Sequence, residues 1–368
     1  MNEDRIAIIG GGWYGCHIAA TLLALGFKVT LYEKSDRLMN AASGNNQFRL
    51  HMGFHYARHQ GTRLQSRDGF MRFVERYLPL TRSVENNIYA VARDESLVDY
   101  PTYKLIMSAS GLSFTEIEAP DFLKNTEGVI ITRERVLLLN DVRNYFTRIL
   151  GSSLELRYEV KEIISKGQKE IIDGEAFDYV IDCTWGHFNR PSLPIYYEPT
   201  ILLYYEGDSR APAVTLVDGP LCSVYPTEDP NIFTLSSVTH TPLGQLEDPG
   251  AARREINAAD GVLVNRKRLL MEEQMSRYIP SFADNFRFLG PQFSIKTKLL
   301  GSFDDRSCYV QHNDRRISVM SGKIDTVFFA MERILAILEF AHSPELGAAT
   351  TSLRSDINRT VSRRSENA

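Results

Sequence analysis

The sequence has no long apolar run, which argues against a helix that crosses a membrane. Its most apolar stretches, around residues 18–27 and 334–341, are about ten residues long, whereas a membrane-spanning helix needs about 20. The first five residues, Met-Asn-Glu-Asp-Arg, carry acidic side chains where a signal peptide would be basic. From these two absences we expect a cytoplasmic protein without a membrane partner.

Cysteine is scarce, and its spacing does not fit a metal motif. The four cysteines stand far apart, and none belongs to a Cys-X-X-Cys or Cys-X-X-His pattern. Neither a metal site nor a disulfide framework is therefore expected. Buried free thiols are the simplest interpretation of Cys16, Cys183, Cys222 and Cys308.

A strong excess of one charge is also absent. The chain has 42 Lys and Arg residues against 46 Asp and Glu residues, a net charge of −4, which gives no general reason to expect nucleic acid. The region 49–82 is an exception, because seven arginines stand there against Asp68 and Glu75. This surplus either serves an anionic ligand or forms ion pairs with acids elsewhere in the fold. The seven are Arg49, Arg58, Arg63, Arg67, Arg72, Arg76 and Arg82.

The composition that remains is that of a globular protein. Hydrophobic residues make up 43% of the 368 residues and charged residues 24%, and this length corresponds to about two domains. The apolar run 6–9 is typical of a buried parallel strand. A helix is predicted over 13–25, where Gly26 ends it, and a second strand over 27–32. The chain therefore starts with a strand, a helix and a parallel strand.

The turn between the first strand and the helix is rich in glycine. Gly10, Gly12 and Gly15 allow, in that order, a tight turn, the approach of a pyrophosphate and the packing of the helix on the strand. The helix N-terminus faces the phosphate charge. Glu33, at the end of the second strand, can accept the ribose hydroxyls of an adenosine. These features predict a bound dinucleotide, either NAD or FAD, with Trp13, Tyr14 and Lys34 as further contacts.

Three later segments resemble one family of flavoproteins. The first runs from Ala41 to Arg49 and is small and polar, the second follows the strand 178–183, and the third precedes the last predicted helix. In this order and spacing they resemble the D-amino-acid-oxidase-like family, which includes glycine and sarcosine oxidases. The second segment departs from the family, which more often has Ala-Thr-Gly where this chain has Thr184-Trp185-Gly186.

The resemblance implies FAD as the cofactor and assigns the three segments to it. It also implies that the N-terminus of the last helix, together with Lys323, stabilises negative charge on the reduced flavin. The residues assigned to FAD in this way are Ser43, Gly44, Asn45, Asn46, Gln47, Thr184, Trp185, Gly186, Ser321, Gly322, Lys323, Ile324 and Asp325.

Patterns typical of parallel strands occur at the start, in the middle and at the end of the chain, with a succession of strands over 198–240. We therefore predict an α/β fold, in which a discontinuous, Rossmann-like FAD-binding domain carries an inserted, mainly antiparallel β substrate domain. The predicted FAD-binding domain comprises 1–80, 141–195 and 296–345. The predicted substrate domain comprises 81–140 and 196–295, and a polar C-terminal tail covers 346–368.

Cationic side chains are the first candidates for binding a substrate carboxylate. Arg49 ends the segment that resembles a flavin-covering loop, although an FAD phosphate or a structural acid is an equally good partner for it. Arg316 is a second candidate, within a group that includes Arg306 and Arg315. The resemblance further implies that a lysine near the flavin assists oxygen reduction. Lys296 and Lys298 can take this role, because alternation puts them on one face of a strand.

Aromatic and imidazole groups complete the candidate site. His51 and His55 lie four residues apart, where they either face the flavin and the substrate or serve the core. Tyr205 is the tyrosine selected to bind substrate, although Tyr204 and Tyr225 lie in the same group of strands and aromatic residues are common in sheets.

The sequence thus predicts an enzyme that oxidises the C–N bond of an amino acid or secondary amine. Hydride would pass to the flavin, the imine would be hydrolysed and oxygen would reoxidise the cofactor. An alternative substrate is an amino acid attached to a modified DNA or RNA base, which the arginines of 49–82 and of the tail favour and the overall acidity opposes. The remaining alternatives are an NAD-dependent dehydrogenase and a flavoprotein without turnover.

Overall fold

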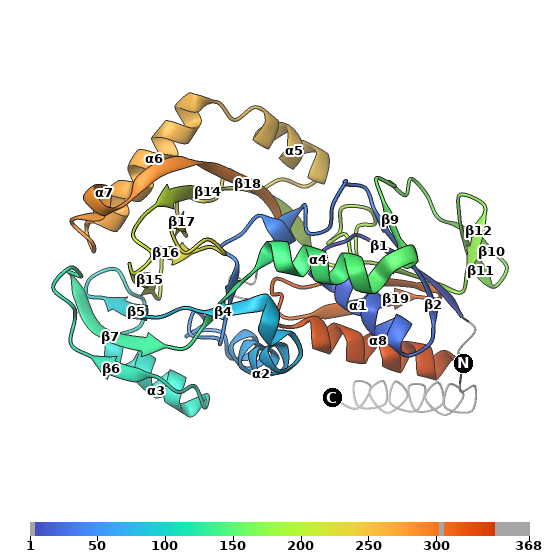
Figure 1. Cartoon of the computed structure of the whole chain (residues 1–368), viewed down its shortest axis with the longest axis horizontal. Helices are drawn as coiled ribbons and strands as arrows, with labels where there is room; N and C mark the ends of the chain where they lie inside the picture. The colour runs from blue at the N-terminus through green and yellow to red at the C-terminus, as the bar shows by residue number, and fades with distance from the viewer. Residues whose placement is uncertain (1–3, 302–304, 343–368) are drawn as a thin grey trace, which may run out of the picture.

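Two large β-sheets organise the chain, and each has its own helices (Figure 1). The structure is a computed structural model that describes residues 4–301 and 305–342. Within these residues no helix is both long and apolar enough to cross a membrane. The predicted tail over 346–368 lies outside the described residues.

The first sheet has six strands and is built around the N-terminal strand. This strand is apolar because both of its faces are covered, and Ile6, Ala7 and Ile8 are fully buried. Neighbouring strands are parallel except for one edge strand, Tyr309–Asn313, which is antiparallel to its neighbour. Across the sheet the order is β19 (Tyr309–Asn313), β20 (Arg316–Met320), β13 (Tyr179–Asp182), β1 (Arg5–Ile9), β2 (Lys28–Glu33) and β9 (Leu154–Leu156).

Helices cover one face of the six-stranded sheet, and a small β-sheet covers the other. On the helical face Trp13 is buried in an aromatic core with Phe73 and Phe146. On the opposite face Ile9 packs with Phe177. The helices are α1 (Trp13–Ala24), α2 (Gln60–Tyr77), α4 (Leu139–Leu150) and α8 (Val327–His342), and the small sheet consists of β10 (Ile164–Lys166), β11 (Lys169–Ile172) and β12 (Glu175–Phe177).

The second sheet has eight strands and is mainly antiparallel. Two of its strands are 12 and 13 residues long and run from the eight-stranded sheet back toward the six-stranded one (Figure 1). A single parallel pair, β5 with β15, occurs in it. The strand order is β18 (Arg287–Leu299), β14 (Ile195–Glu206), β17 (Ile232–Ser237), β16 (Cys222–Pro226), β15 (Ala213–Val217), β5 (Asn87–Ala92), β7 (Thr126–Thr132) and β6 (Thr115–Ile117).

The two faces of the eight-stranded sheet differ in polarity. One face is apolar and packs on α6 (Gly261–Ser276) and α7 (Phe282–Asn285), and α5 (Pro249–Asn257) lies against β14 and β18. The other face carries hydroxyl, phenol and amide groups toward the six-stranded unit, and α3 (Tyr100–Ala109) covers its far end. A three-stranded sheet of β3 (Arg49–Leu50), β8 (Arg135–Leu137) and β4 (Thr81–Ser83) packs into the core of the six-stranded unit.

The fold class is the one that the sequence predicts, an α/β fold with a discontinuous Rossmann-like unit and an inserted, mainly antiparallel sheet. Two segments differ from what their sequence pattern alone would predict. Residues 257–278 have a helical pattern, but the Asp260 side chain accepts the Leu263 N–H and α6 begins there. Residues 154–164 have a strand pattern, but they are divided between β9 of the large parallel sheet and β10 of the small one.

Candidate active site

The glycine turn after β1 leaves no room for side chains. Gly10 has a φ of +103°, which favours glycine over any other residue. A Cβ on Gly15 would lie 1.9 Å from the Gly10 carbonyl oxygen, and a Cβ on Gly12 would lie 2.9 Å from Ser43 Oγ. The backbone at the start of α1 is therefore open to a close approach, as a pyrophosphate requires.

Glu33 is held at the end of β2 by two backbone amides. Its Oε2 accepts a hydrogen bond from Gly11 N at 2.7 Å, and its Oε1 accepts one from Ser35 N at 2.8 Å. These bonds fix the carboxylate beside the glycine turn, where the ribose of a dinucleotide would lie. The neighbouring Lys34 is exposed.

The segment 41–47 mainly shapes its own backbone. Asn45 and Asn46 donate to carbonyl oxygens four or five residues before them, and the Gln47 amide binds Ser223 and Thr234 of the eight-stranded sheet. Ser43 differs, because its Oγ accepts the Trp13 N–H at 3.2 Å at the N-terminus of α1. Within this segment Ser43 is therefore the side chain best placed beside a phosphate, and the Trp13 side chain serves the core instead.

The turn after β13 lies beside the glycine turn. A Cβ on Gly10 would lie 3.1 Å from the Cys183 carbonyl oxygen, which shows how closely the two turns approach. Trp185 has a φ of +61°, and its buried Nε1 has no hydrogen-bond partner within residues 4–301 and 305–342. Thr184 instead donates to Asp182 and holds the turn in place. The indole N–H of Trp185 is thus free to donate to a ligand.

The turn after β20 brings the partly buried Lys323 and the buried Asp325 to the same end of the sheet. The Tyr14 hydroxyl donates to the Lys323 carbonyl oxygen at 2.5 Å, which fastens this turn to α1. Burial lowers the pKa of Lys323 and raises the pKa of Asp325, and the attraction between the two groups opposes both shifts. The Lys323 ammonium also lies 4.4 Å from the centre of the Tyr56 ring.

A hollow lies between the turns after β13 and β20 and the strand β18. Burial lowers the pKa of Lys296 to about 8, and Lys298 forms an ion pair with Glu198 at 2.5 Å. Of the two lysines expected near the cofactor, one is thus neutralised by a carboxylate. The hollow is lined by Lys298 together with Trp185, Arg306, Ser321 and Gly322, among others.

Arg49 lies buried where the two sheets meet. Its Nη1 donates to Thr215 Oγ1 at 2.6 Å and to the Tyr89 hydroxyl at 3.3 Å. The guanidinium carbon lies 3.8 Å from the centre of the Tyr225 ring, a cation–π contact. Nε and Nη2 are buried and have no hydrogen-bond partner among the residues that the structure describes. The structure therefore holds Arg49 by one edge and leaves its other N–H groups for a ligand.

A buried carboxylate that the sequence does not reveal lies close to Arg49. Glu134 is fully buried and accepts hydrogen bonds from Tyr89, Asn87 and the Met52 amide. His51 Nδ1 lies 4.0 Å from Glu134 Oε1. In the sequence Glu134 stands between two arginines and is typical of an exposed turn, so no local signal marks it.

The two candidate histidines lie together in this cluster. The centres of the His51 and His55 rings are 4.5 Å apart, and His55 Nδ1 lies 2.7 Å from the Tyr89 hydroxyl. Burial, with the charges of Lys323 and Arg49 as smaller causes, holds the pKa of each imidazole well below its usual value. Both rings are therefore neutral at pH 7.

The residues present fit a flavin dinucleotide, and the comparison with known proteins agrees. The glycine turn after β1 has no Cβ atoms, and the Glu33 carboxylate is fixed at the end of β2. The indole N–H of Trp185 has no partner among the described residues. These groups lie at one end of the parallel sheet. A family model described as FAD dependent oxidoreductase matches residues 5–284. The chain belongs to this family of FAD-dependent oxidoreductases. FAD is accordingly its cofactor.

Full-length relatives of this oxidoreductase support the assignment. The chain is 58% identical over 341 residues, 92% of each protein, to a protein of Fusarium mangiferae named FAD-dependent monooxygenase FPY4. Glycine oxidase from Geobacillus kaustophilus has the same fold, with a TM-score of 0.67 at 15% identity over 91% of this chain and 95% of that one. L-α-glycerophosphate oxidase from Mycoplasma pneumoniae reaches a TM-score of 0.70 at 13% identity, over 90% and 94%.

Two of the expected substrate-binding residues lie elsewhere in this oxidoreductase. Arg316 stands at the start of β20, the end remote from the glycine turn, and pairs with Glu170 at 2.9 Å. Tyr205 is on the apolar face of β14, packed on Phe282, because successive side chains of a strand point to opposite faces. Tyr204 is therefore the one that faces the six-stranded unit.

The arginine surplus of 49–82 is used within the chain. Arg58 pairs with Asp218, Arg63 is buried against backbone carbonyls, and Arg72 pairs with Glu332. Arg67, Arg76 and Arg82 also have partners inside the protein. Arg58, Arg67 and Arg72 therefore form ion pairs, whereas Arg63 and Arg82 donate to backbone carbonyl oxygens. The basic residues of the tail, Arg354, Arg359, Arg363 and Arg364, lie outside the described residues.

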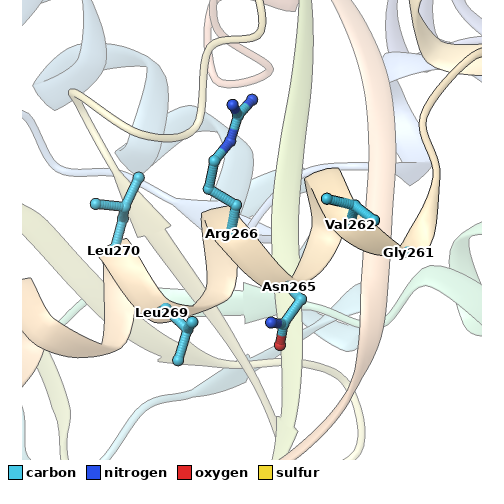
Figure 2. Close-up of a pocket in the computed structure, with 6 residues that line it drawn as sticks. All are labelled: Gly261, Val262, Asn265, Arg266, Leu269 and Leu270. Atoms are coloured by element: carbon cyan, nitrogen blue, oxygen red, sulfur yellow. The ribbon is translucent and has the colours of Figure 1, made fainter.

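A separate surface hollow runs along α6 (Figure 2). It lies on the outer side of this helix, whose Met271 and Met275 pack inward on the eight-stranded sheet. Its lining is mainly aliphatic, and it shares no residue with the clusters around Arg49 and Lys323, so we do not assign catalysis to it. The lining residues are Gly261, Val262, Asn265, Arg266, Leu269 and Leu270.

Proposed function

We propose that this oxidoreductase oxidises the C–N bond of an amino acid or a related secondary amine whose carboxylate binds Arg49. The supporting observation is the buried guanidinium with two unpartnered nitrogen atoms. Buried N–H groups without acceptors are costly, and a planar carboxylate supplies acceptors in the geometry that a guanidinium prefers. Because Thr215 binds Nη1 of Arg49 and the Tyr225 ring lies against the plane of the guanidinium, the carboxylate would bind in one orientation.

The chemistry that FAD would supply when bound is acceptance of a hydride from the carbon next to the substrate nitrogen. The protein contributes binding, orientation and charge. Arg49 holds the acid group, and the neutral rings of His51 and His55 add no positive charge that would disfavour an amine nearby. Hydrolysis of the resulting imine would give a carbonyl compound and the free amine, and oxygen would accept the two electrons.

Anaerobic titration of the purified holoenzyme tests this proposal. Glycine, sarcosine and a panel of other amino acids are added while the flavin absorbance is followed. We expect an amine acid to bleach the flavin, and the matching amine without the carboxylate to require a far higher concentration. An amino acid attached to a DNA or RNA base is offered last, as the other nitrogen substrate. If no amine of either kind reduces the flavin, the proposed function is wrong.

Monooxygenation is a second candidate, favoured by the name of the relative that is 58% identical. Such a reaction places one oxygen atom of O₂ in the product and the other in water, and a reduced nicotinamide would supply the two further electrons. Reduction of the flavin by NADH or NADPH, together with ¹⁸O from labelled O₂ in the product, would establish it. An amine oxidase would instead be reduced by substrate alone, and the oxygen of its product would come from water.

A further inference from the structure

The outer side of α6 exposes aliphatic side chains at the edge of the molecule (Figure 1). Val262, Leu269 and Leu270 are 76%, 52% and 37% exposed and line the hollow of about 530 Å³ shown in Figure 2. The inner side of the helix is anchored to the eight-stranded sheet by Met271 and Met275. Single exposed leucines are common, whereas several aliphatic side chains along one hollow are typical of a surface that contacts another protein.

The charged side chains of α6 fall into two groups. Those that bind other groups of the chain are Lys267, Arg268 and Glu272. Arg266 differs, because it is exposed and forms no ion pair with any residue that the structure describes. Glu273 is exposed as well and lies 3.9 Å from Arg277, which binds Glu95 more closely at 3.0 Å. The helix thus presents one cation and one anion that a partner could bind.

These two charges are placed symmetrically about the pair of leucines. Arg266 precedes Leu269 by three residues, and Glu273 follows Leu270 by three residues. Because residues three and four apart are neighbours on a helix, all four side chains share one face. The face therefore has a cation at one end, an anion at the other and an apolar centre. Rotation by half a turn about that centre exchanges the two charges.

We propose that the α6 face binds the same face of a second copy of this chain, with the two helices antiparallel. The residues of the α6 face are Val262, Arg266, Leu269, Leu270 and Glu273. A twofold axis between the leucine pairs puts Leu269 of each copy against Leu270 of the other. Arg266 of each copy then lies opposite Glu273 of the other, so that two ion pairs flank an apolar centre. A twofold interface must be complementary to itself, and this arrangement is.

The charge pattern favours a second copy over other occupants. Nucleic acid and anionic membranes attract clustered cations, whereas the α6 face has one charge of each sign. In a parallel pair of helices Arg266 would meet Arg266 and Glu273 would meet Glu273, and such like-charge contacts are unfavourable. The contact is limited to one face of a 16-residue helix. Because standard interfaces bury about 800 Å² on each partner, we expect a reversible dimer with a micromolar dissociation constant.

Sedimentation velocity of the holoenzyme between about 1 and 200 µM tests this proposal without any substrate. The wild-type protein should shift from monomer to dimer as its concentration rises. Arg266→Glu and Glu273→Arg each put like charges together at both ends of the interface, so each should raise the dissociation constant by about 10- to 100-fold. An equal mixture of the two variants should associate as wild type does, because both pairs are then of opposite charge.

The mixture also serves as the control for folding, because two misfolded variants would not restore each other. Arg148→Glu reverses an exposed arginine on α4 and should dimerise as wild type. A wild-type protein that stays monomeric over the whole range overturns the inference, whether the α6 face remains open or another molecule covers it. A dimer that neither charge reversal weakens uses another surface and overturns it as well. The same holds if the mixed variants fail to associate.

Discussion

Arg49 is held on three sides by neutral groups and kept open on the fourth. Thr215 and Tyr89 bind one nitrogen and Tyr225 lies under the plane, while in the described part of the chain no carboxylate forms an ion pair with the guanidinium. The charge that balances it, Glu134, acts through Tyr89. A direct ion pair would occupy the N–H groups that a ligand needs. Because Tyr89 stands between Glu134 and Arg49, Glu134 offsets the charge of the arginine without occupying the N–H groups that a ligand would bind.

Replacing Arg49 by lysine tests this arrangement. The ammonium keeps the charge but loses the planar pair of N–H groups, so binding of a carboxylate substrate should weaken by about 10- to 100-fold. We expect KM to rise by this factor with a smaller change in kcat. The measurement is steady-state oxygen uptake with the best amine acid from the titration. An unchanged KM would show that the carboxylate binds elsewhere.

Gly15 is expected to be essential for cofactor binding because its neighbour leaves no space. A Cβ there would lie 1.9 Å from the Gly10 carbonyl oxygen, so Gly15→Ala must displace the glycine turn, which we expect to approach the pyrophosphate. The purified variant should contain less than a tenth of the wild-type FAD, measured by absorbance after desalting. Gly244→Ala is the control, because no atom lies within 4 Å of a Cβ at that position. Full FAD content in Gly15→Ala would contradict this explanation.

In the strand β14, a shift of one residue decides which face of the sheet a tyrosine side chain occupies. Tyr204 and Tyr205 are adjacent, yet the first faces the six-stranded unit and the second faces α6, where its hydroxyl donates to Glu272 at 2.9 Å. Residue type alone does not tell which of the two tyrosines could bind a substrate. The difference comes from the register of β14 in its sheet, which the neighbouring strands determine.

The two tyrosines should respond differently to loss of the hydroxyl. Tyr205→Phe should lower the free energy of unfolding by about 1 kcal/mol and leave KM and kcat within twofold. Tyr204→Phe removes the partner of Gln292, whose Oε1 is already unpartnered, and should shift KM or kcat at least threefold. Urea unfolding and steady-state kinetics on both variants check this. Equal kinetic effects would mean that the two faces do not divide the functions as described.

Local signals account for what the sequence could predict. The strand, glycine turn, helix and acid of residues 5–33 are contiguous, and the turns after β13 and β20 follow apolar strands closely. The cluster around Arg49 is different, because Tyr89, Glu134 and Thr215 come from segments about 40 to 80 residues apart. Tyr89 lies in an apolar run and Glu134 beside arginines, so each is locally typical of an ordinary core or surface position.

For the whole molecule, a buried histidine predicts a loss of stability in mild acid. His17 is 4% exposed, contacts the Tyr77 hydroxyl at 2.7 Å, and burial lowers its pKa from 6.5 to about 3. Between these two values the unfolded chain binds a proton that the folded chain does not, so stability falls as pH decreases below 6.5. From pH 7 to pH 5 this residue should remove about 2 kcal/mol from the free energy of unfolding.

Urea unfolding at pH 7 and pH 5 measures this loss. His17→Gln, which cannot titrate, should show a difference between the two pH values that is smaller by about 2 kcal/mol. His312→Gln removes an exposed histidine and should keep the wild-type difference. The explanation fails if both variants keep it.

The six-stranded sheet also sets an order of events during synthesis. Its strands come from three separated stretches, and β20, which pairs with β13, is followed by the turn that carries Lys323 and Asp325. While the ribosome is still translating the eight-stranded sheet, the glycine turn and Glu33 have already emerged, yet one side of β13 has no neighbour. We therefore expect stable uptake of FAD only after the turn that follows β20 has left the ribosome, and nascent chains stalled before that point should not retain the flavin.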